Sequence, residues 1–238
     1  MSKKKKQELT AEERLQEALV PQEECPYEVP ENWVWVELGY VVQTSKAKTD
    51  TFNSDVKYVG LEHMEKDGGV IGYGDATDLK STKNLFSVGD VLYGKLRPYL
   101  NKHDVATFEG VCSTDILVFK SSEQCNINLV NYFMDLDYFI DLSVSNSKGI
   151  NLPRVSQDVL LRFPFPLPPL PEQQRIVTQI ETLFHKLDKA KELIKPSIDV
   201  KGVTNISGEI DHMKKSILAR AFRGQLGTND PKDQSILG

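Results

Sequence analysis

Apolar and polar residues are distributed differently along three stretches of the chain. Residues 1–30 are dense in Lys and Glu and hold few large apolar side chains, which favours a partly disordered arm because little apolar surface is available for burial. Residues 11–20 nevertheless have helical spacing, and Thr10 is placed to cap the first turn. A short helix within the arm is therefore the alternative, ending where prolines interrupt regular structure.

Residues 31–170 carry short apolar runs bounded by turn-forming residues, a pattern typical of strands. Glycine-rich turn signals occur at residues 67–69 and 72–75. The spacing of apolar residues over 129–142 is helical instead. This combination predicts an α+β domain with a twisted, mainly antiparallel sheet. Strands are expected at residues 33–38, 57–61, 91–93 and 116–119.

Apolar residues after Glu172 recur at alternating steps of four and three, which is the seam of a packed helix. The first helix is expected to run from Glu172 to Lys195, which at ~1.5 Å per residue makes it roughly 36 Å long. A loop containing Gly202 and a second helix ending near Gly224 complete an antiparallel helical hairpin or coiled coil. The seam residues expected at an assembly surface are Ile176, Ile180, Leu183, Leu187, Ile194, Ile210, Met213 and Ile217.

The helical pattern leaves open what the seam packs against. It is compatible with a spacer that joins two chains and equally with a helical pair that packs on its own domain, because the apolar spacing is the same in both cases. The expected organisation is an arm (residues 1–30), a globular domain (31–170), a helical region (171–226) and a C-terminal tail (227–238).

The composition is that of a globular protein, since the 238 residues are 39% hydrophobic and 26% charged. A formal net charge of −5 argues against a protein that coats nucleic acid nonspecifically. Any nucleic-acid role then needs a local basic face or positive charge supplied by a partner. The three cysteines lack metal or disulfide spacing and no segment is apolar enough to cross a membrane, so we expect reduced thiols and a cytoplasmic protein.

The sequence contains none of the familiar motifs of catalysis or cofactor binding. Dinucleotide-binding glycines, a phosphate-binding loop, a zinc-protease motif and a serine nucleophile elbow are all missing from it. The histidines are scattered, and Glu62 and Glu65 beside His63 have no second ligand cluster to complete a metal site. We therefore expect no catalytic residue, no metal site and no cofactor on this chain, which is predicted not to be an enzyme.

Two polar stretches suggest a nucleic-acid interface. Residues 89–102 combine basic side chains with tyrosines, and residues 145–154 form a glycine-containing loop with two basic residues. Arginine can bond a guanine edge with two hydrogen bonds, whereas lysines and backbone amides hold phosphates. Solvated lysines, an arginine paired internally with a carboxylate and an ordinary loop remain equally compatible with the pattern. The candidate DNA-binding residues are Lys80, Lys83, Lys95, Arg97, Tyr99, Lys102, Lys148 and Arg154.

Several motifs in a fixed order resemble one protein family. The longest, FPFPLPPLPEQQRIV at residues 163–177, resembles the junction between recognition domain and conserved helix in the specificity subunits of type I restriction–modification systems. The resemblance extends over about residues 27–226. The other motifs are WVWVEL at 33–38, GDVLYGKLRPYLNK at 89–102, CSTDILV at 112–118 and MKKSILARAFRGQL at 213–226.

The resemblance implies a role in DNA recognition within a larger complex. A full specificity subunit resembles two copies in series of recognition domain plus helix, and each recognition domain binds one half of a bipartite site in double-stranded DNA. The paired helices set the distance between the half-sites. Methyltransferase subunits bind S-adenosylmethionine and perform the chemistry, and restriction (translocase) subunits join for cleavage. The expected partners are therefore DNA, the methyltransferase subunit and the restriction subunit, with no membrane contact.

The chain departs from that pattern because it carries one recognition domain and one helical region. The expectation is a half-length form that acts as a homodimer. A two-fold dimer presents two identical domains, so its target is expected to be a bipartite inverted repeat. The alternatives are a truncated remnant, or an interaction protein that occupies the methyltransferase subunit as a decoy without recognising DNA.

Overall fold

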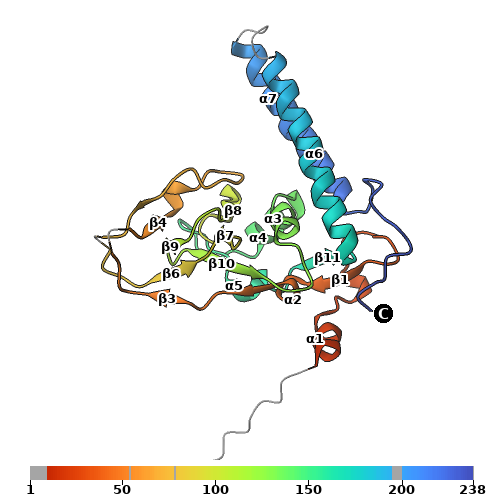
Figure 1. The fold of residues 1–238 in the computed structure, drawn as a ribbon, viewed down its shortest axis with the longest axis horizontal. Helices are drawn as coiled ribbons and strands as arrows, with labels where there is room; N and C mark the ends of the chain where they lie inside the picture. Colours follow the sequence, from red (N-terminus) through yellow and green to blue (C-terminus); the bar gives the residue numbers. More distant parts are fainter. Residues whose placement is uncertain (1–9, 54, 78, 195–199, 238) are drawn as a thin grey trace, which may run out of the picture.

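The computed structural model describes residues 10–237 apart from Ser54, Asp78 and residues 195–199, and only the backbone of residues 200–205. Short strands and helices form a globular part, from which two long helices rise side by side (Figure 1). Among the described strand pairs, all but one are antiparallel. The expectation of an α+β fold followed by a long helix is confirmed.

The described strands form three sheets rather than one continuous sheet. The smallest pairs β1 (Val34–Glu37) with β11 (Pro164–Leu167). The four-stranded sheet has the order β2 (Val42–Thr44), β10 (Ile116–Ser121), β7 (Val91–Gly94) and β8 (His103–Val105). The five-stranded sheet has the order β3 (Lys48–Thr49), β6 (Lys83–Phe86), β9 (Gly110–Cys112), β4 (Lys57–Val59) and β5 (Gly74–Asp75), in which β9 and β4 are parallel.

All the expected strands form, but the helix expected over residues 129–142 is divided. It consists of α3 (Ile127–Met134) and α4 (Asp137–Ser145). Between them, Leu136 is extended with a ψ of 135°, and Asp135 is hydrogen-bonded to a buried histidine. This tertiary contact overrides the continuous helical spacing of the sequence. Shorter helical elements are η1 (Gln22–Glu24), α2 (Leu38–Val41), η2 (Leu61–His63), η3 (Pro98–Leu100) and α5 (Gln157–Leu160).

The described part of the N-terminal arm packs on the domain and contains the short helix that the sequence offered as the alternative, while residues 1–9 lie outside the described residues. The expected helix is α1 (Ala11–Ala18), capped reciprocally by Thr10 and Glu13. Its residue Leu15 is buried in the main core. The backbone N–H of Val20 then donates to the carbonyl of Trp35 in β1 at 3.0 Å, which adds a short segment beside that strand.

The main core joins the globular part to the base of the long helices. Phe133 of α3 lies edge-on to Phe165 of β11 at 4.9 Å between ring centroids and to Phe222 at 5.6 Å. Phe222 directly follows the second long helix and is fully buried. A second, smaller core cluster fills the space beside the five-stranded sheet and includes Val59, Phe86 and Cys112. The helices are therefore continuous with the main core and not a separate module.

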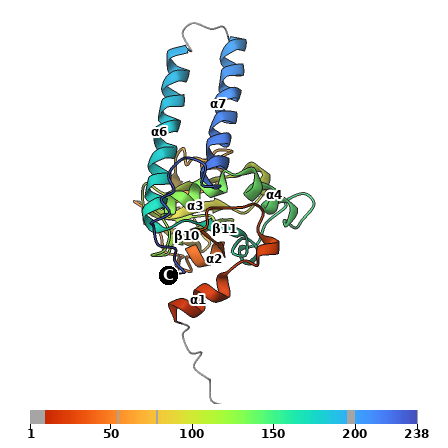
Figure 2. The ribbon, with the colours of Figure 1, turned by 90° about the vertical axis from the view of Figure 1, so that its right-hand side faces the viewer.

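The long helices are α6 (Leu170–Ile194) and α7 (Val200–Ala221), which lie side by side and project beyond the globular part (Figure 2). Gly202, expected in a loop, lies within α7. Across the pair, Lys214 Nζ lies 2.7 Å from Asp188 Oδ1 and 5.2 Å from the ring centroid of Phe184. None of the described helices is long and apolar enough to cross a lipid bilayer.

The seam residues occupy different environments, which corrects part of the expected assembly surface. Ile176 and Ile180 are fully buried in the core of their own domain, where no other chain can contact them. Ile210 is also buried, while Leu183, Leu187 and Ile217 are half-buried. Ile194, near the far end of α6, is 41% exposed, and Met213, which lies closer to the domain than Ile210, is 49% exposed. An interchain role therefore remains a prediction for the seam residues that are not buried.

The first turn of α6 and the C-terminal tail are joined by a buried polar cluster centred on Glu172. This side chain is fully buried, and its carboxylate accepts hydrogen bonds from Trp33 Nε1 at 2.7 Å and Asn229 Nδ2 at 2.9 Å. Thr228 Oγ1 lies 3.3 Å from the second oxygen. Arg175 of the same helix donates to the carbonyl of Thr228 at 2.9 Å and pairs with Asp233. The described tail is thus part of the folded unit.

Buried His103 links β8 to α3 and is expected to make stability depend on pH. Its Nδ1 lies 2.8 Å from Asn131 Oδ1 and its Nε2 lies 3.0 Å from Asp135 Oδ1. Burial lowers the pKa of His103, but the charge and hydrogen bond of Asp135, the hydrogen bond with Asn131 and a smaller effect of Asp104 outweigh it and raise the pKa above its ordinary 6.5. A raised folded-state pKa stabilises the protein below the unfolded value, and this contribution is lost as pH rises through the folded value.

Replacing Asp135 with asparagine is expected to remove this pH dependence. The melting temperature of the wild type should fall relative to that of Asp135→Asn as the pH is raised above about 6.5. Thermal unfolding of both proteins over a pH series measures the difference. Two curves that stay parallel across the series would contradict the assignment of His103 as the titrating group.

Candidate nucleic-acid interface

Two segments that are distant in sequence meet at the end of β7. Beyond this strand, Arg97 adopts a left-handed backbone conformation (φ 53°) and turns the chain into η3. The Arg97 N–H donates to the carbonyl of Pro153 at 2.7 Å, and the Val155 N–H donates to the carbonyl of Lys95 at 3.1 Å. The structure therefore brings together the two basic stretches that the sequence indicated separately. We call Lys95, Arg97, Tyr99, Lys148 and Arg154 the basic site.

The second segment is a loop that closes on itself. The N–H of Lys148 donates to the carbonyl of Arg154, and the N–H of Arg154 donates to the carbonyl of Lys148, each at 2.9 Å. Gly149 has a φ of +107°, a conformation that L side chains rarely adopt. These contacts fix the conformation of residues 149–153 and place both basic residues at the base of the loop.

Asp115 holds the base of this loop to the rest of the domain. Its two carboxylate oxygens accept from Nε and Nη2 of Arg154 at 3.1 and 3.2 Å, a bidentate pair. The hydrogen bond and charge of Asp115 raise the pKa of Arg154. Lys95 Nζ lies 3.9 Å from the same carboxylate. An internal pairing with a carboxylate was left open for the arginine of residues 89–102, but in the structure it is Arg154 that is paired in this way. Asp115 positions the loop, a contact that the sequence did not indicate.

Three members of the basic site present their side chains outward. Arg97 and Lys148 are exposed, and among the described residues no group is hydrogen-bonded to the guanidinium of the first or the ammonium of the second. Tyr99 is 49% exposed in η3. The guanidinium of Arg97 has its donors available for a base edge, and the ammonium of Lys148 is available for a phosphate. Recognition of a base edge between two phosphate backbones requires both kinds of group.

The remaining candidates do not join this site. Lys83 is 8% exposed, and its Nζ donates to the carbonyl and hydroxyl of Ser81. The Nζ of Lys102 donates to the carbonyls of Leu61 and Met64 at 2.8 and 2.7 Å. Both ammonium groups therefore hold loops of the domain, which corrects their expected role as DNA contacts. Lys80 is exposed between β5 and β6, away from the hydrogen bonds that build the site.

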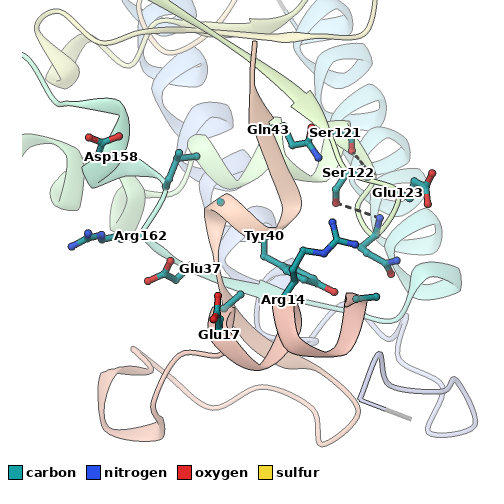
Figure 3. A pocket seen from close by; sticks show the side chains of 15 residues that line it. Arg14, Glu17, Glu37, Tyr40, Gln43, Ser121, Ser122, Glu123, Asp158 and Arg162 are labelled. Atoms are coloured by element: carbon teal, nitrogen blue, oxygen red, sulfur yellow. Dashed lines mark hydrogen bonds between the residues drawn. The ribbon is translucent and has the colours of Figure 1, made fainter. Parts of the chain in front are cut away.

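A separate groove lies between α1, α2 and the segment connecting β10 to α3 (Figure 3). Its volume is about 840 Å³. Carboxylates outnumber guanidinium groups along it, so its charge opposes phosphate binding and the groove is not part of the candidate interface. The charged lining residues are Arg14, Glu17, Glu37, Glu123, Asp158 and Arg162.

Comparison with known sequences identifies relatives over most of the chain. A family described as the type I restriction modification DNA specificity domain matches residues 30–195. The specificity subunit of the type I restriction enzyme EcoDI from Escherichia coli is 32% identical over 202 residues, which cover 83% of this chain and 43% of the relative. The EcoEI specificity subunit, also from Escherichia coli, is 21% identical over 262 residues, covering 90% and 44%.

Solved structures show the same fold. The HsdS subunit from Thermoanaerobacter tengcongensis superimposes with a TM-score of 0.63 at 25% identity, covering 73% of this chain and 47% of that one. A chain from a structure concerned with complex assembly and conformational transition of the type I R-M system gives a TM-score of 0.52 at 20% identity, covering 84% and 48%. The chain thus spans about half the length of the relatives and structures that it matches.

Proposed function

Because this chain belongs to the family of type I restriction–modification DNA specificity subunits, we propose that its globular part recognises one half of a bipartite site in double-stranded DNA. Its matched relatives are named specificity subunits, which supports the prediction of a DNA-recognition component. The proposal rests on one observation above all. Two basic segments are held together by backbone hydrogen bonds, so that the side chains of Arg97 and Lys148 project with no hydrogen-bond partner in the described part of the chain.

The geometry suggests a division of roles within the basic site. Arg97 is proposed to reach a guanine edge, and Lys148 to hold a phosphate. Arg154 supports the loop through Asp115 and serves DNA binding indirectly. The site answers the objection raised by the net charge of −5, because positive charge is concentrated locally even though the whole chain is acidic.

The helical pair is proposed to join two copies of the chain and to receive the methyltransferase subunit. Its outer half projects from the domain (Figure 1) and carries exposed apolar side chains, with Leu193 at 72%. A two-fold pair of identical domains would select an inverted repeat. S-adenosylmethionine and the chemistry of methylation would belong to the methyltransferase subunit, and a restriction subunit would add cleavage.

A methylation map tests the proposed function. The chain is co-expressed with the methyltransferase subunit, and host DNA is sequenced for modified bases, with the methyltransferase alone as control. A bipartite palindromic motif that depends on this chain is expected. An asymmetric motif would contradict the homodimer and leave DNA recognition intact. A complex that assembles and yields no motif would favour a decoy that binds the methyltransferase without recognising DNA.

Replacing Arg97 with alanine is expected to weaken binding of the assembled complex to its target by about 1–3 kcal/mol, because a bidentate base contact is lost. The left-handed backbone conformation at position 97 costs alanine about as much free energy as it costs arginine, so the melting temperature should not change. Equilibrium binding to target and scrambled duplexes measures the effect. Arg97→Lys keeps the charge and should lose specificity, whereas Arg162→Ala in the acidic groove should bind like the wild type.

A further inference from the structure

The tip of the loop in the basic site has surface properties that the roles assigned above do not use. Ile150 is 100% exposed and Leu152 is 46% exposed, although bulky apolar side chains are usually buried. Asn151 lies between them and is exposed as well. The tip therefore offers an amide flanked by two apolar side chains, all facing solvent.

This tip is held in place before any ligand arrives. The backbone hydrogen bonds between Lys148 and Arg154 close the base of the loop, and Pro153 accepts from the Arg97 N–H. A Cβ on Gly149 would lie 3.1 Å from the carbonyl oxygen of Leu152, so the backbone of the loop also approaches itself closely. A preorganised loop loses little conformational entropy on binding, which suits a recognition element.

We propose that this tip enters the major groove of DNA and recognises A·T base pairs. Asparagine matches the N6 and N7 edge of adenine with two hydrogen bonds, and an apolar side chain fits against the thymine methyl group. The major groove is wide enough to admit a narrow protein element, and the isolated antiparallel bridge between Lys148 and Arg154 closes the loop into a narrow projection. Asn151 is assigned to adenine and Ile150 to the thymine methyl group. The inference rests on the proposed function and names the bases that it involves.

Charge around the tip supports DNA as its ligand. Lys148 stands at the base of the loop, and Arg97 is hydrogen-bonded to the loop through its own backbone. Both side chains are exposed, so positive charge flanks an apolar tip, as a groove bounded by phosphates requires. Contact of the same tip with a protein partner is the competing outcome, which the experiment below separates.

The experiment uses the full chain assembled with its methyltransferase subunit and a duplex carrying the target found by methylation mapping. Each thymine of the target is replaced in turn by deoxyuridine, which removes only the methyl group. Each adenine is replaced in turn by 7-deazaadenine, which removes only the N7 acceptor. Affinities are measured for the wild type, Ile150→Ala and Asn151→Ala. Val144→Ala removes an exposed apolar side chain from α4, outside the tip, and is the matched control.

We expect the wild type and Val144→Ala to lose about fourfold in affinity at one thymine when its methyl group is removed. They should lose about tenfold at one adenine when N7 is removed. Ile150→Ala should be insensitive to the first replacement and Asn151→Ala to the second, because each variant already lacks the contact. Tip variants that respond to every analogue as the wild type does would overturn the inference.

Two further results keep this test separate from that of the proposed function. If Arg97→Ala loses target binding while the tip variants match the wild type, the tip inference fails and the proposed function stands. If the wild-type complex shows no preference for any sequence, both fail. If Ile150→Ala weakens assembly with the methyltransferase subunit in sedimentation experiments and leaves the analogue responses unchanged, the tip contacts protein and the inference is overturned.

Discussion

Replacing Glu172 with alanine is expected to lower the free energy of unfolding by about 3 kcal/mol, because buried donors lose their acceptor. The indole N–H of Trp33 and the amide of Asn229 both donate to its carboxylate, and the side chain is fully buried. In the variant the indole N–H of Trp33 loses its acceptor, whereas the amide of Asn229 keeps only its bond to Asn32 Oδ1. Denaturant unfolding of the variant and the wild type measures the loss.

The matched control is Glu181→Ala, which removes an exposed carboxylate from the same helix. Its effect should stay within about 0.5 kcal/mol. Equal losses for Glu172→Ala and Glu181→Ala would show that removal of any carboxylate from α6, and not the loss of the buried cluster, explains the result. A small loss for both would mean that the tail does not contribute to the stability of the folded unit.

Met213→Asp is expected to separate the proposed pair of chains without unfolding either of them. Met213 is 49% exposed in the single chain, so an aspartate there remains hydrated in the monomer. Burying that charge between two chains costs about 3 kcal/mol, which corresponds to roughly a hundredfold loss of affinity. Sedimentation equilibrium gives the mass, and thermal unfolding checks that the fold is intact.

The adjacent substitution His212→Asp places the same charge on another face of α7 and should leave the mass unchanged. Ile180→Asp should instead unfold the protein, because Ile180 is fully buried in its own domain and a charge there has no partner. Thermal unfolding would then show the loss of the fold. A Met213→Asp variant with the wild-type mass would exclude this part of the helical pair from the contact.

Periodicity predicted the elements of this fold better than their arrangement. The strands and both long helices are present because their apolar spacing is strong and local. The break at Leu136 was not predictable, since it depends on a contact between Asp135 and His103 from a different strand. The division into three sheets depends on pairing across long sequence distances, for example β1 with β11, which no local pattern encodes.

In the candidate site, too, the sequence indicated residues but not the contacts between them. Residue type and loop composition indicated Arg97 and the loop near Lys148, and the structure brings them together. Composition could not separate an available cation from one that is already paired, so Lys102 and Arg154 were indistinguishable from Arg97 in the sequence. Asp115 lies within the CSTDILV motif, but that motif gave no sign of its pairing with Arg154, because this partner lies 39 residues away.

The contact between the two ends of the chain has a consequence for how the protein is made. Asn32 donates to the carbonyl of Asp230, 198 residues later, and Phe222 completes the core around Phe133. Contacts of such long sequence separation form slowly, because closing a long loop costs entropy before the contact is gained. The core therefore cannot close on a nascent chain until the residues around Phe222 and Asp230 have been synthesised, and until then apolar strands remain exposed to chaperones and to aggregation.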